Sequence, residues 1–541
     1  MTERELARPN ILWISLEDTS PRFGCYGDPL ARTPNIDKLA SEGTRFPLAF
    51  STAGVCAPSR SAIITGMYQT SIGTHHMRTT HTHANSSELP TPYHTVTPHY
   101  VKTFTEYLRA AGYYCTNNKK TDYQFEPPLT AWDELGSHGH WRNRERGQPF
   151  FSVFNPTLTH ESGMWPEKER QPLQTDPDRV ELPPYLPNTR IAREALARHY
   201  DNIAEADKIV GRLLQQLEED GLADNTIVFL WSDHGEGLPR AKRWPYDAGI
   251  RVPLLVRWPG QVEPQAVSDQ LVSLVDLGPT VLSCAGIDIP YHMQGQPFLG
   301  DRKQEREYVF ASRDRYDQSY DMIRAIRDKK YKYIRNYYPD LPRMMWVSFN
   351  NQHPVQQEMW RLHREGKLEG IQNLMFEKRP VEELYDTEND PHELYNLAKD
   401  PNYRDKLAEL RNVLDEWLEQ HGDMGKMDEG QMVANFWPGG VQPQTAAPVY
   451  IPIAAGSPGI EASLEGGAYP APMLVQLYCA TQGASITYTT ETGGDARWKL
   501  YTEPLRLTGG TTTIRVRASR IGYKHSEERS ASFTVGDPSF L

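Results

Sequence analysis

Two apolar runs of strand length, each followed closely by acidic residues, constrain the fold of this chain more than any other feature. The first run, residues 10–16, ends in Glu17 and Asp18, and a second run far along the chain leads into Asp233 and His234. Runs that are apolar on both faces predict central strands of a sheet that helices cover. Open α/β sheets bind ligands outside the carboxyl ends of their strands, so we expect these four side chains to meet in one crevice.

The pattern of residue types changes along the chain and predicts four parts. A helical periodicity lies between the two apolar runs, and a strand-like stretch followed by an amphipathic helix comes later. A segment rich in Pro, Gly and Ala follows, and short alternating strands lie beyond it. We therefore predict an α/β core at residues 1–310, a smaller α+β subdomain at 311–430, a linker at 431–470 and an all-β sandwich at 471–541.

Composition excludes several classes of function. The 541 residues carry a formal net charge of -12, which argues against a polyanion-binding surface over the whole molecule, and we predict no nucleic-acid partner. The five cysteines show no CxxC spacing, which fits a reducing compartment better than a disulfide framework. The N-terminus lacks an apolar run, and no apolar run reaches the roughly eighteen residues of a membrane span. We expect a cytoplasmic protein without a membrane partner.

The most specific motif is Cys-Ala-Pro-Ser-Arg at residues 56–60, followed by Thr65 and Gly66. It resembles the signature of the type I sulfatase family, Cys-x-Pro-Ser-Arg with a trailing Thr-Gly. The resemblance implies that a maturation enzyme oxidises Cys56 to formylglycine, whose hydrated aldehyde supplies the nucleophilic hydroxyl. The second hydroxyl of the hydrate can then expel sulfate by re-forming the carbonyl. The alternative interpretation is a buried structural cysteine at the start of a helix.

The resemblance extends to a metal site. Glu17 and Asp18 stand where sulfatases carry a pair of acidic ligands, and Asp233 and His234 match the second ligand pair. With the oxygen derived from Cys56, they imply a site for one hard divalent cation. Glu17 is longer than the usual aspartate, and His234 places an imidazole where an amide is common, which leaves Ca²⁺ and Mn²⁺ both open. A polar turn after a strand is the alternative interpretation of Asp233 and His234.

Four basic groups complete the catalytic set that the resemblance implies. Arg60 would hold the hydrated aldehyde, and Lys242 and His160 match groups that contact the sulfate and the leaving group. Lys120 matches the lysine of a Gly-Lys-Trp-His motif, in which Asp122 replaces the histidine. Cations aimed at the oxygens of the transferred group lower the barrier as charge develops there. The alternative for each lysine is a solvated surface charge.

A histidine-dense stretch at residues 73–83 follows the nucleophile segment. Its residues His75, His76 and Arg78 are candidates for lining a subsite for an anionic or sugar-like substrate, and the histidines are also candidates for a second metal site. A polar loop is the alternative interpretation. Arg313, much later in the chain, is a further candidate for the same pocket.

The resemblance covers about residues 9–420 and is closest to the branch of heparan N-sulfatase-like and bacterial arylsulfatase-like proteins. It implies an alkaline phosphatase-like α/β fold, with a large central mixed sheet flanked by helices. The tail is similar to the small β-sandwich appended to chitobiase and β-hexosaminidases.

Three functions stay open at this stage. The first is metal-dependent hydrolysis of a small anionic ester, either an aryl sulfate or a sulfated sugar. The second is hydrolysis of a phosphonate monoester or phosphodiester, because a tetrahedral anion of that kind fits the same set of groups. The third is a non-catalytic protein that binds sulfated glycans. Assembly into a homo-oligomer also stays open.

Overall fold

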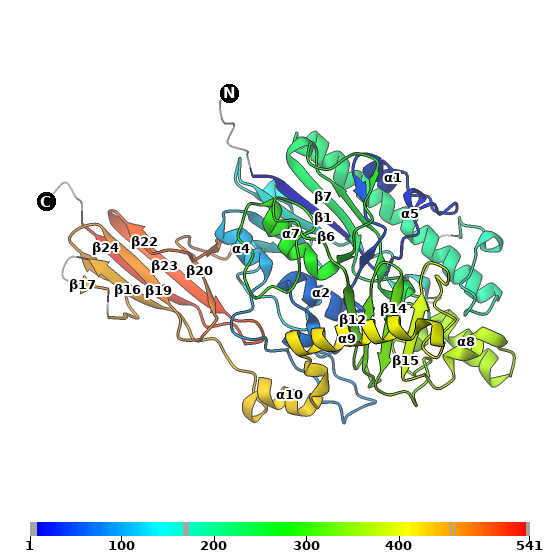
Figure 1. Cartoon of the computed structure of the whole chain (residues 1–541). Coiled ribbons are helices and arrows are strands. Elements are labelled where there is room, and N and C mark those ends of the chain that lie inside the picture. Colours follow the sequence, from blue (N-terminus) through cyan, green and yellow to red (C-terminus); the bar gives the residue numbers. More distant parts are fainter. Residues whose placement is uncertain (1–7, 166–171, 455–456, 460, 537–541) are drawn as a thin grey trace.

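An eight-stranded mixed sheet forms the centre of the computed structural model, which describes residues 8–165, 172–454, 457–459 and 461–536 (Figure 1). The strand order is β10-β2-β9-β7-β1-β6-β4-β5. Strands β7, β1, β6 and β4 run parallel, whereas β9 is antiparallel to β7. The predicted large mixed sheet is therefore confirmed. The bounds are β1 Asn10–Leu16, β2 Thr44–Arg45, β4 Tyr114–Asn118, β5 Glu134–Leu135, β6 Phe150–Phe154, β7 Thr226–Ser232, β9 Leu254–Arg257 and β10 Ala266–Val267.

The two apolar runs of the sequence are the neighbouring central strands β1 and β7, and every residue in them is buried. Alternate side chains of β1 enter opposite cores: Ile11 and Trp13 join one hydrophobic cluster, and Leu12 and Ile14 join the other. Burial of each large apolar side chain contributes about 1.5–3 kcal/mol. The two strands pair in parallel along their whole length, and their last residues, Leu16 and Ser232, are partners. The carboxyl ends of the two strands therefore lie side by side.

Helices cover both faces of this sheet. The long helix α5 (Arg190–Glu219) packs with α1 (Pro34–Ser41) on one face through Ile203, Val210 and Ile36. On the other face lie α2 (Cys56–Thr65), α4 (Phe104–Ala110) and α7 (Leu277–Cys284). The helical periodicity that the sequence shows between the two apolar runs corresponds to α5.

A second, antiparallel sheet follows the central one in the chain, with the order β12-β13-β14-β15. Helix α9 (Arg404–His421) lies across it in Figure 1, and Trp417 of α9 stacks on Phe310 with ring centroids 4.5 Å apart. The strands are β12 Val309–Arg313, β13 Ile323–Arg327, β14 Tyr331–Asn336 and β15 Glu382–Asp386. A third, small sheet consists of β3 (Ala49–Phe50), β8 (Arg251–Val252) and β11 (Val272–Ser273), and β11 contacts β12. Shorter helices are α3 Gln69–Ile72, α6 Asp247–Ile250, α8 Pro354–Arg364 and α10 Glu429–Phe436.

The C-terminal part is a β-sandwich of two largely antiparallel sheets, which share one core that includes Tyr450, Val516 and Phe533. One sheet contains β16 Val449–Ala454, β17 Ser457–Pro458, β19 Met473–Tyr478 and β22 Leu505–Leu507; the other contains β18 Gly467–Tyr469, β20 Ser485–Thr489, β21 Lys499–Leu500, β23 Gly510–Ser519 and β24 Arg529–Val535. The segment expected to be a linker is partly regular structure, because β16 and β18 within it complete the sandwich.

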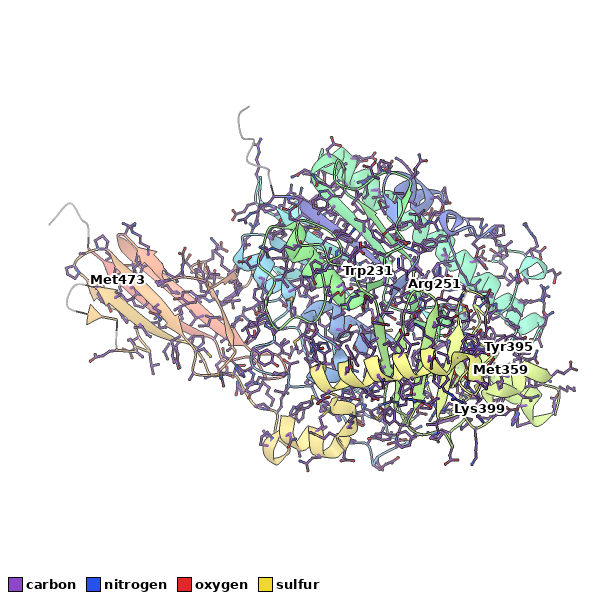
Figure 2. The ribbon with its side chains drawn as sticks, in the orientation of Figure 1. Trp231, Arg251, Met359, Tyr395, Lys399 and Met473 are labelled. Atoms are coloured by element: carbon purple, nitrogen blue, oxygen red, sulfur yellow. The ribbon has the colours of Figure 1, made fainter. Side chains whose placement is uncertain are left out.

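The sandwich is docked against the α/β part of the molecule. Met473 marks the sandwich and Trp231 marks the central sheet in Figure 2. Lys102 Nζ donates hydrogen bonds to Gly483 O and Ser485 Oγ, both at 2.7 Å, and Arg109 donates to Trp498 O at 2.9 Å. Among the described residues, no helix has both the length and the apolar character needed to cross a bilayer.

Candidate active site

The site begins where β1 and β7 end side by side. Asp18, Asp233 and His234 follow these strands directly and are fully buried. The backbone N–H of Asp18 donates to Asp233 Oδ1 at 3.2 Å, and His234 Nε2 lies 3.1 Å from Asp18 Oδ1. Asp18 has φ 46°, a left-handed conformation uncommon for a non-glycine residue, which turns the chain back into the site. The side chains that follow the carboxyl ends of the two strands therefore meet, as expected, in one buried cluster.

Cys56 is the first residue of helix α2, and its side chain joins the same cluster. Its Sγ lies 3.3 Å from His234 Nε2, and the residue is only 2 % exposed. The N-cap residue Val55 provides no side-chain cap, so the positive end of the helix dipole faces the nucleophile position uncapped. Ser59 anchors the helix by donating to Asp233 O at 2.6 Å.

Arg60 and Lys120 contribute two cations from different elements. Arg60, one turn along α2, donates from Nε to Asp233 Oδ2 and from Nη1 to Asn155 Oδ1, both at 2.9 Å. Lys120 Nζ lies 2.8 Å from Glu17 Oε1. Burial disfavours the ammonium group, but Cys56 and Glu17 raise the pKa of Lys120 well above its usual value. Lys120 is therefore charged near neutral pH.

Lys242 and His160 form the opposite wall. Lys242 Nζ donates to Asp18 Oδ2 at 2.6 Å and lies 3.3 Å from His160 Nε2. Burial, together with the Lys242 charge, lowers the pKa of His160 to about 4. Burial opposes the charge of Lys242 as well, but Asp18 and Cys56 raise its pKa. Lys242 is thus the charged member of this pair and His160 the neutral one.

A buried ion pair that the sequence did not single out supports this wall. Arg243 donates to both carboxylate oxygens of Glu161, at 3.0 and 2.8 Å, and Glu161 Oε1 also lies 3.1 Å from Lys242 Nζ. The backbone N–H of Glu161 donates to Asp18 Oδ2 at 2.6 Å. The available signal was adjacency, because Glu161 follows His160 and Arg243 follows Lys242 in the chain. Asn155, at the end of β6, was also missed.

The donor set at this site fits a divalent cation. Ligand atoms of Asp18, Cys56 and His160 lie within 4.8 Å of one another, and so do those of Cys56, Asp233 and His234. Asp18 Oδ1 is buried and receives no hydrogen bond of acceptable geometry, which leaves a carboxylate oxygen free to act as a ligand. Glu17, the expected fourth ligand, belongs to neither group, and its Oε1 lies beside Lys120 instead. Carboxylate oxygens and one imidazole suit Ca²⁺ or Mn²⁺, as expected.

Of the four candidates for lining the substrate pocket, three lie in the interior. His75 and His76 are almost fully buried, and His76 Nδ1 accepts a hydrogen bond from the backbone N–H of Arg315 at 3.2 Å. Arg313 lies 3.1 Å from Asp321 and stacks over Trp244 with its guanidinium carbon 3.9 Å from the ring centroid. Arg78 is the partly exposed member of the four.

Comparison with known proteins agrees with this geometry. A family model described as Sulfatase matches residues 9–137 and 139–287, and a model described as N-sulphoglucosamine sulphohydrolase, C-terminal matches residues 235–378. An ulvan-active sulfatase from Formosa agariphila is 41% identical over 560 residues, covering 96% of this chain and 90% of the relative. The resemblance predicted from the motif is confirmed.

Solved structures show the same fold. A 2-O GAG sulfatase aligns with TM-score 0.59 and 21% identity, covering 78% of this chain and 94% of that chain. A phosphonate monoester hydrolase from Silicibacter pomeroyi aligns with TM-score 0.57 and 18% identity, covering 77% and 97%. The curated relatives are enzymes that hydrolyse sulfuric esters, which sets aside a non-catalytic glycan-binding protein. This chain belongs to the sulfatase family.

Proposed function

We propose that this chain hydrolyses sulfate esters of sulfated sugars, with formylglycine derived from Cys56 as the nucleophile. The observation that carries the proposal is the position of Cys56 Sγ, 3.3 Å from His234 Nε2 at the meeting point of β1, β7 and α2. The 41% identity to an ulvan-active sulfatase supports a sulfated sugar as the substrate class.

Two groups supply chemistry that the twenty amino acids lack. Hydrated formylglycine provides one hydroxyl for attack on sulfur and a second whose proton loss re-forms the aldehyde and releases sulfate. Asp18, Asp233 and His234 would hold a divalent cation, which supplies Lewis-acid stabilisation of oxygen charge. These ligands are themselves fixed by Arg60 and Lys242, because Arg60 binds Asp233 and Lys242 binds Asp18.

The chain's own cations would surround the sulfate. Lys120 and Lys242 belong to the two walls of the site, one anchored by Glu17 and the other by Asp18 and Glu161. Charges that are held in place before substrate binds require no reorganisation when the sulfate oxygens gain charge. His160 shares the Lys242 wall, so the pair can hold the proton that the leaving oxygen requires.

The direct test is mass spectrometry of the peptide that contains Cys56, combined with assays of the same preparation. We expect the mass loss that conversion of the thiol to an aldehyde produces. Cys56→Ala should lower turnover of 4-nitrophenyl sulfate by at least about 10³-fold, because no other group can supply the hydrated aldehyde. Fully active protein with only unmodified thiol at Cys56 would refute the nucleophile.

The same assay distinguishes sulfate esters from the alternative substrate class, phosphonate monoesters. The phosphonate monoester hydrolase of similar fold shows that this architecture also accommodates phosphonate chemistry. Wild-type protein should therefore be given 4-nitrophenyl sulfate and a 4-nitrophenyl phosphonate monoester in parallel. Higher kcat/KM for the sulfate supports our proposal, and a preference for the phosphonate reverses it.

A further inference from the structure

Arg78 and Asp317 form an unusual matched pair of turns beside the active site. Met77 and Tyr316 form a parallel β-bridge, and the residues that follow both adopt left-handed backbone conformations, with φ 57° at Arg78 and 52° at Asp317. Such conformations cost free energy in non-glycine residues and persist only where the surroundings impose them. The two turns bring Arg78 Nε to 2.5 Å from Asp317 Oδ1.

The guanidinium group of Arg78 is held at its inner end and available at its outer end. Asp317 approaches Nε, and the ring of Phe349 lies against the guanidinium, 3.8 Å from its central carbon to the centroid. Arg78 donates no hydrogen bond of good geometry to any residue in the described part of the chain, and 18% of its side chain is exposed. Its two terminal nitrogens are therefore oriented but uncommitted donors.

Two contacts place this guanidinium close to the candidate catalytic residues. Met77 and Tyr316 pack in one hydrophobic cluster with Cys56. Phe349, which carries Arg78 on its face, lies with its centroid 6.1 Å from the ring of His160.

On the other side lies the loop that carries Lys120. Thr79, the residue after Arg78, donates a hydrogen bond from Oγ1 to Gln124 Oε1 at 3.1 Å, and Gln124 follows Asp122 by two residues in this loop. Asp122 in turn lies 3.7 Å from Lys120 Nζ. The stretch that contains Arg78 therefore contacts both the loop that carries Lys120 and the Phe349 ring that lies beside His160.

We propose that Arg78 binds a second anionic group of the substrate, a carboxylate or another sulfate on the sugar that bears the scissile sulfate or on its neighbour. A planar guanidinium with two free terminal nitrogens matches such an anion through paired, charge-assisted hydrogen bonds. Asp317 is a positioning residue, because its carboxylate forms an ion pair with the guanidinium at Nε while the ring of Phe349 lies against the guanidinium carbon. The inference rests on the proposed sulfatase function and narrows its substrates to polyanionic sugars.

The test compares substrates that differ only in the second anion. One is a sulfated disaccharide with a uronic acid next to the sulfated sugar, the second is the same disaccharide with its carboxyl reduced to an alcohol, and the third carries a second sulfate in place of the carboxylate. Wild-type protein should prefer the first or the third over the second, and the preferred one identifies the anion. Arg78→Ala should lower that preference by roughly 10- to 100-fold, mainly through KM.

Two further variants keep the test decisive. Arg78→Ala leaves Asp317 buried without its partner, so the double variant Arg78→Met, Asp317→Asn removes both charges and should show the same loss of preference if it folds. Arg302→Ala is the matched control, because Arg302 also lies 2.5 Å from a carboxylate, that of Asp288. Its segment is far from α2 in the chain. This variant should keep the wild-type preference.

The outcomes separate the two proposals. Equal kcat/KM of the wild type on the charged and reduced disaccharides, or equal losses on both in Arg78→Ala, overturns the role of Arg78. Failure of the wild type to hydrolyse any sulfate ester, including 4-nitrophenyl sulfate, instead overturns the proposed function.

Discussion

Each cation of the active site has a carboxylate partner of its own. Arg60 is paired with Asp233, Lys242 with Asp18 and Arg243 with Glu161, and all six side chains are buried. Removing one partner of a buried pair usually costs about 3–5 kcal/mol, so these charges hold one another in place. The consequence at the residue scale is that most substitutions here affect stability as well as catalysis. The role of a residue is therefore revealed more clearly by kcat/KM measured across a series of substrates than by the rate on one substrate.

At the residue scale, we predict that the loss of rate in His160→Ala depends on the leaving group of the substrate. A good leaving group departs as an anion, whereas a poor one requires a proton in the transition state, and general acid catalysis is worth about 10²–10⁴-fold. If His160, which is neutral at rest, delivers that proton after taking it from the neighbouring Lys242, His160→Ala should lose far more rate on alkyl-like sulfates than on activated aryl sulfates. Lys242→Ala, which removes charge stabilisation and also the charge that lowers the pKa of His160, should lose rate more evenly and serves as the comparison. The measurement is kcat/KM across aryl sulfates of graded basicity, and equal losses for His160→Ala would make it a substrate-positioning group.

The sequence alone predicts the site residues that belong to motifs. It does not predict the site residues that are brought together only by tertiary contacts. Asp18, Asp233 and His234 were predictable because they follow two recognisable strands, and Cys56 and Arg60 because they share one motif. Glu17 was expected beside a metal ion, but its carboxylate lies beside Lys120, whose position depends on a loop conformation that no periodicity encodes. Glu161 and Arg243 each adjoin a candidate residue in the sequence, but their pairing was not predicted, because the two residues meet only in the folded chain.

At the scale of elements, the position of α2 decides where Cys56, the proposed nucleophile, lies. The chain enters this helix through Gly54, whose O accepts from the N–H of Arg243 at 2.5 Å. A Cβ at Gly54 would lie 2.6 Å from Trp244 O and 2.9 Å from Trp244 N, both backbone atoms that cannot move aside. The start of α2 therefore packs directly against the segment that carries Lys242, so a movement of this segment also moves Cys56.

We therefore expect Gly54→Ala to displace the start of α2. The clash should lower kcat on 4-nitrophenyl sulfate by about 10²-fold, because displacements near 1 Å in a catalytic site have that effect. Gly494→Ala is the control, since a Cβ there meets nothing within 4 Å, and it should keep wild-type kcat. Steady-state kinetics of both variants, with circular dichroism to check folding, makes the comparison. Wild-type kcat in Gly54→Ala would show that α2 adapts without moving Cys56.

The elements themselves were predictable to different extents. The strands β1 and β7 and helix α5 have strong periodicity and were found where the pattern predicts them. β16 was missed because its sequence, Val-Tyr-Ile-Pro-Ile-Ala, lies within a segment rich in Pro, Gly and Ala, and proline normally argues against a strand. Pairing with β19 outweighs that local preference.

At the scale of the whole molecule, the sandwich is fitted tightly to the α/β part. Gly483 has φ 76°, and a Cβ there would lie far inside van der Waals contact with His99 O. Arg520 donates to Thr97 O at 3.5 Å, and Lys102 and Arg109 donate across the same boundary at shorter distances. The two parts are therefore expected to unfold together in the wild type.

We expect Gly483→Ala to make the sandwich and the α/β part unfold at different temperatures. The variant introduces both a strained backbone and a clash with the other part, so we expect two thermal transitions in calorimetry where the wild type shows one. Gly510→Ala is the matched control, because Gly510 also has a positive φ, 74°, but a Cβ there meets nothing within 4 Å. It carries the backbone cost of about 1–2 kcal/mol without the clash and should keep a single transition. One transition in both variants would mean that the boundary tolerates the displacement.

The burial of Cys56 has a consequence for the order of events during synthesis. If Cys56 is converted to formylglycine as we propose, the conversion must come before the chain closes over it, because a thiol that is 2 % exposed in the folded chain is out of reach of a modifying enzyme. Asp233 and His234, which complete the buried cluster around Cys56, are translated about 180 residues after Cys56. At about 5–20 residues per second, ribosomes leave a window of roughly 10–35 s in which residue 56 is accessible. A host that folds this chain faster than it oxidises the cysteine would accumulate a correctly folded but inactive protein.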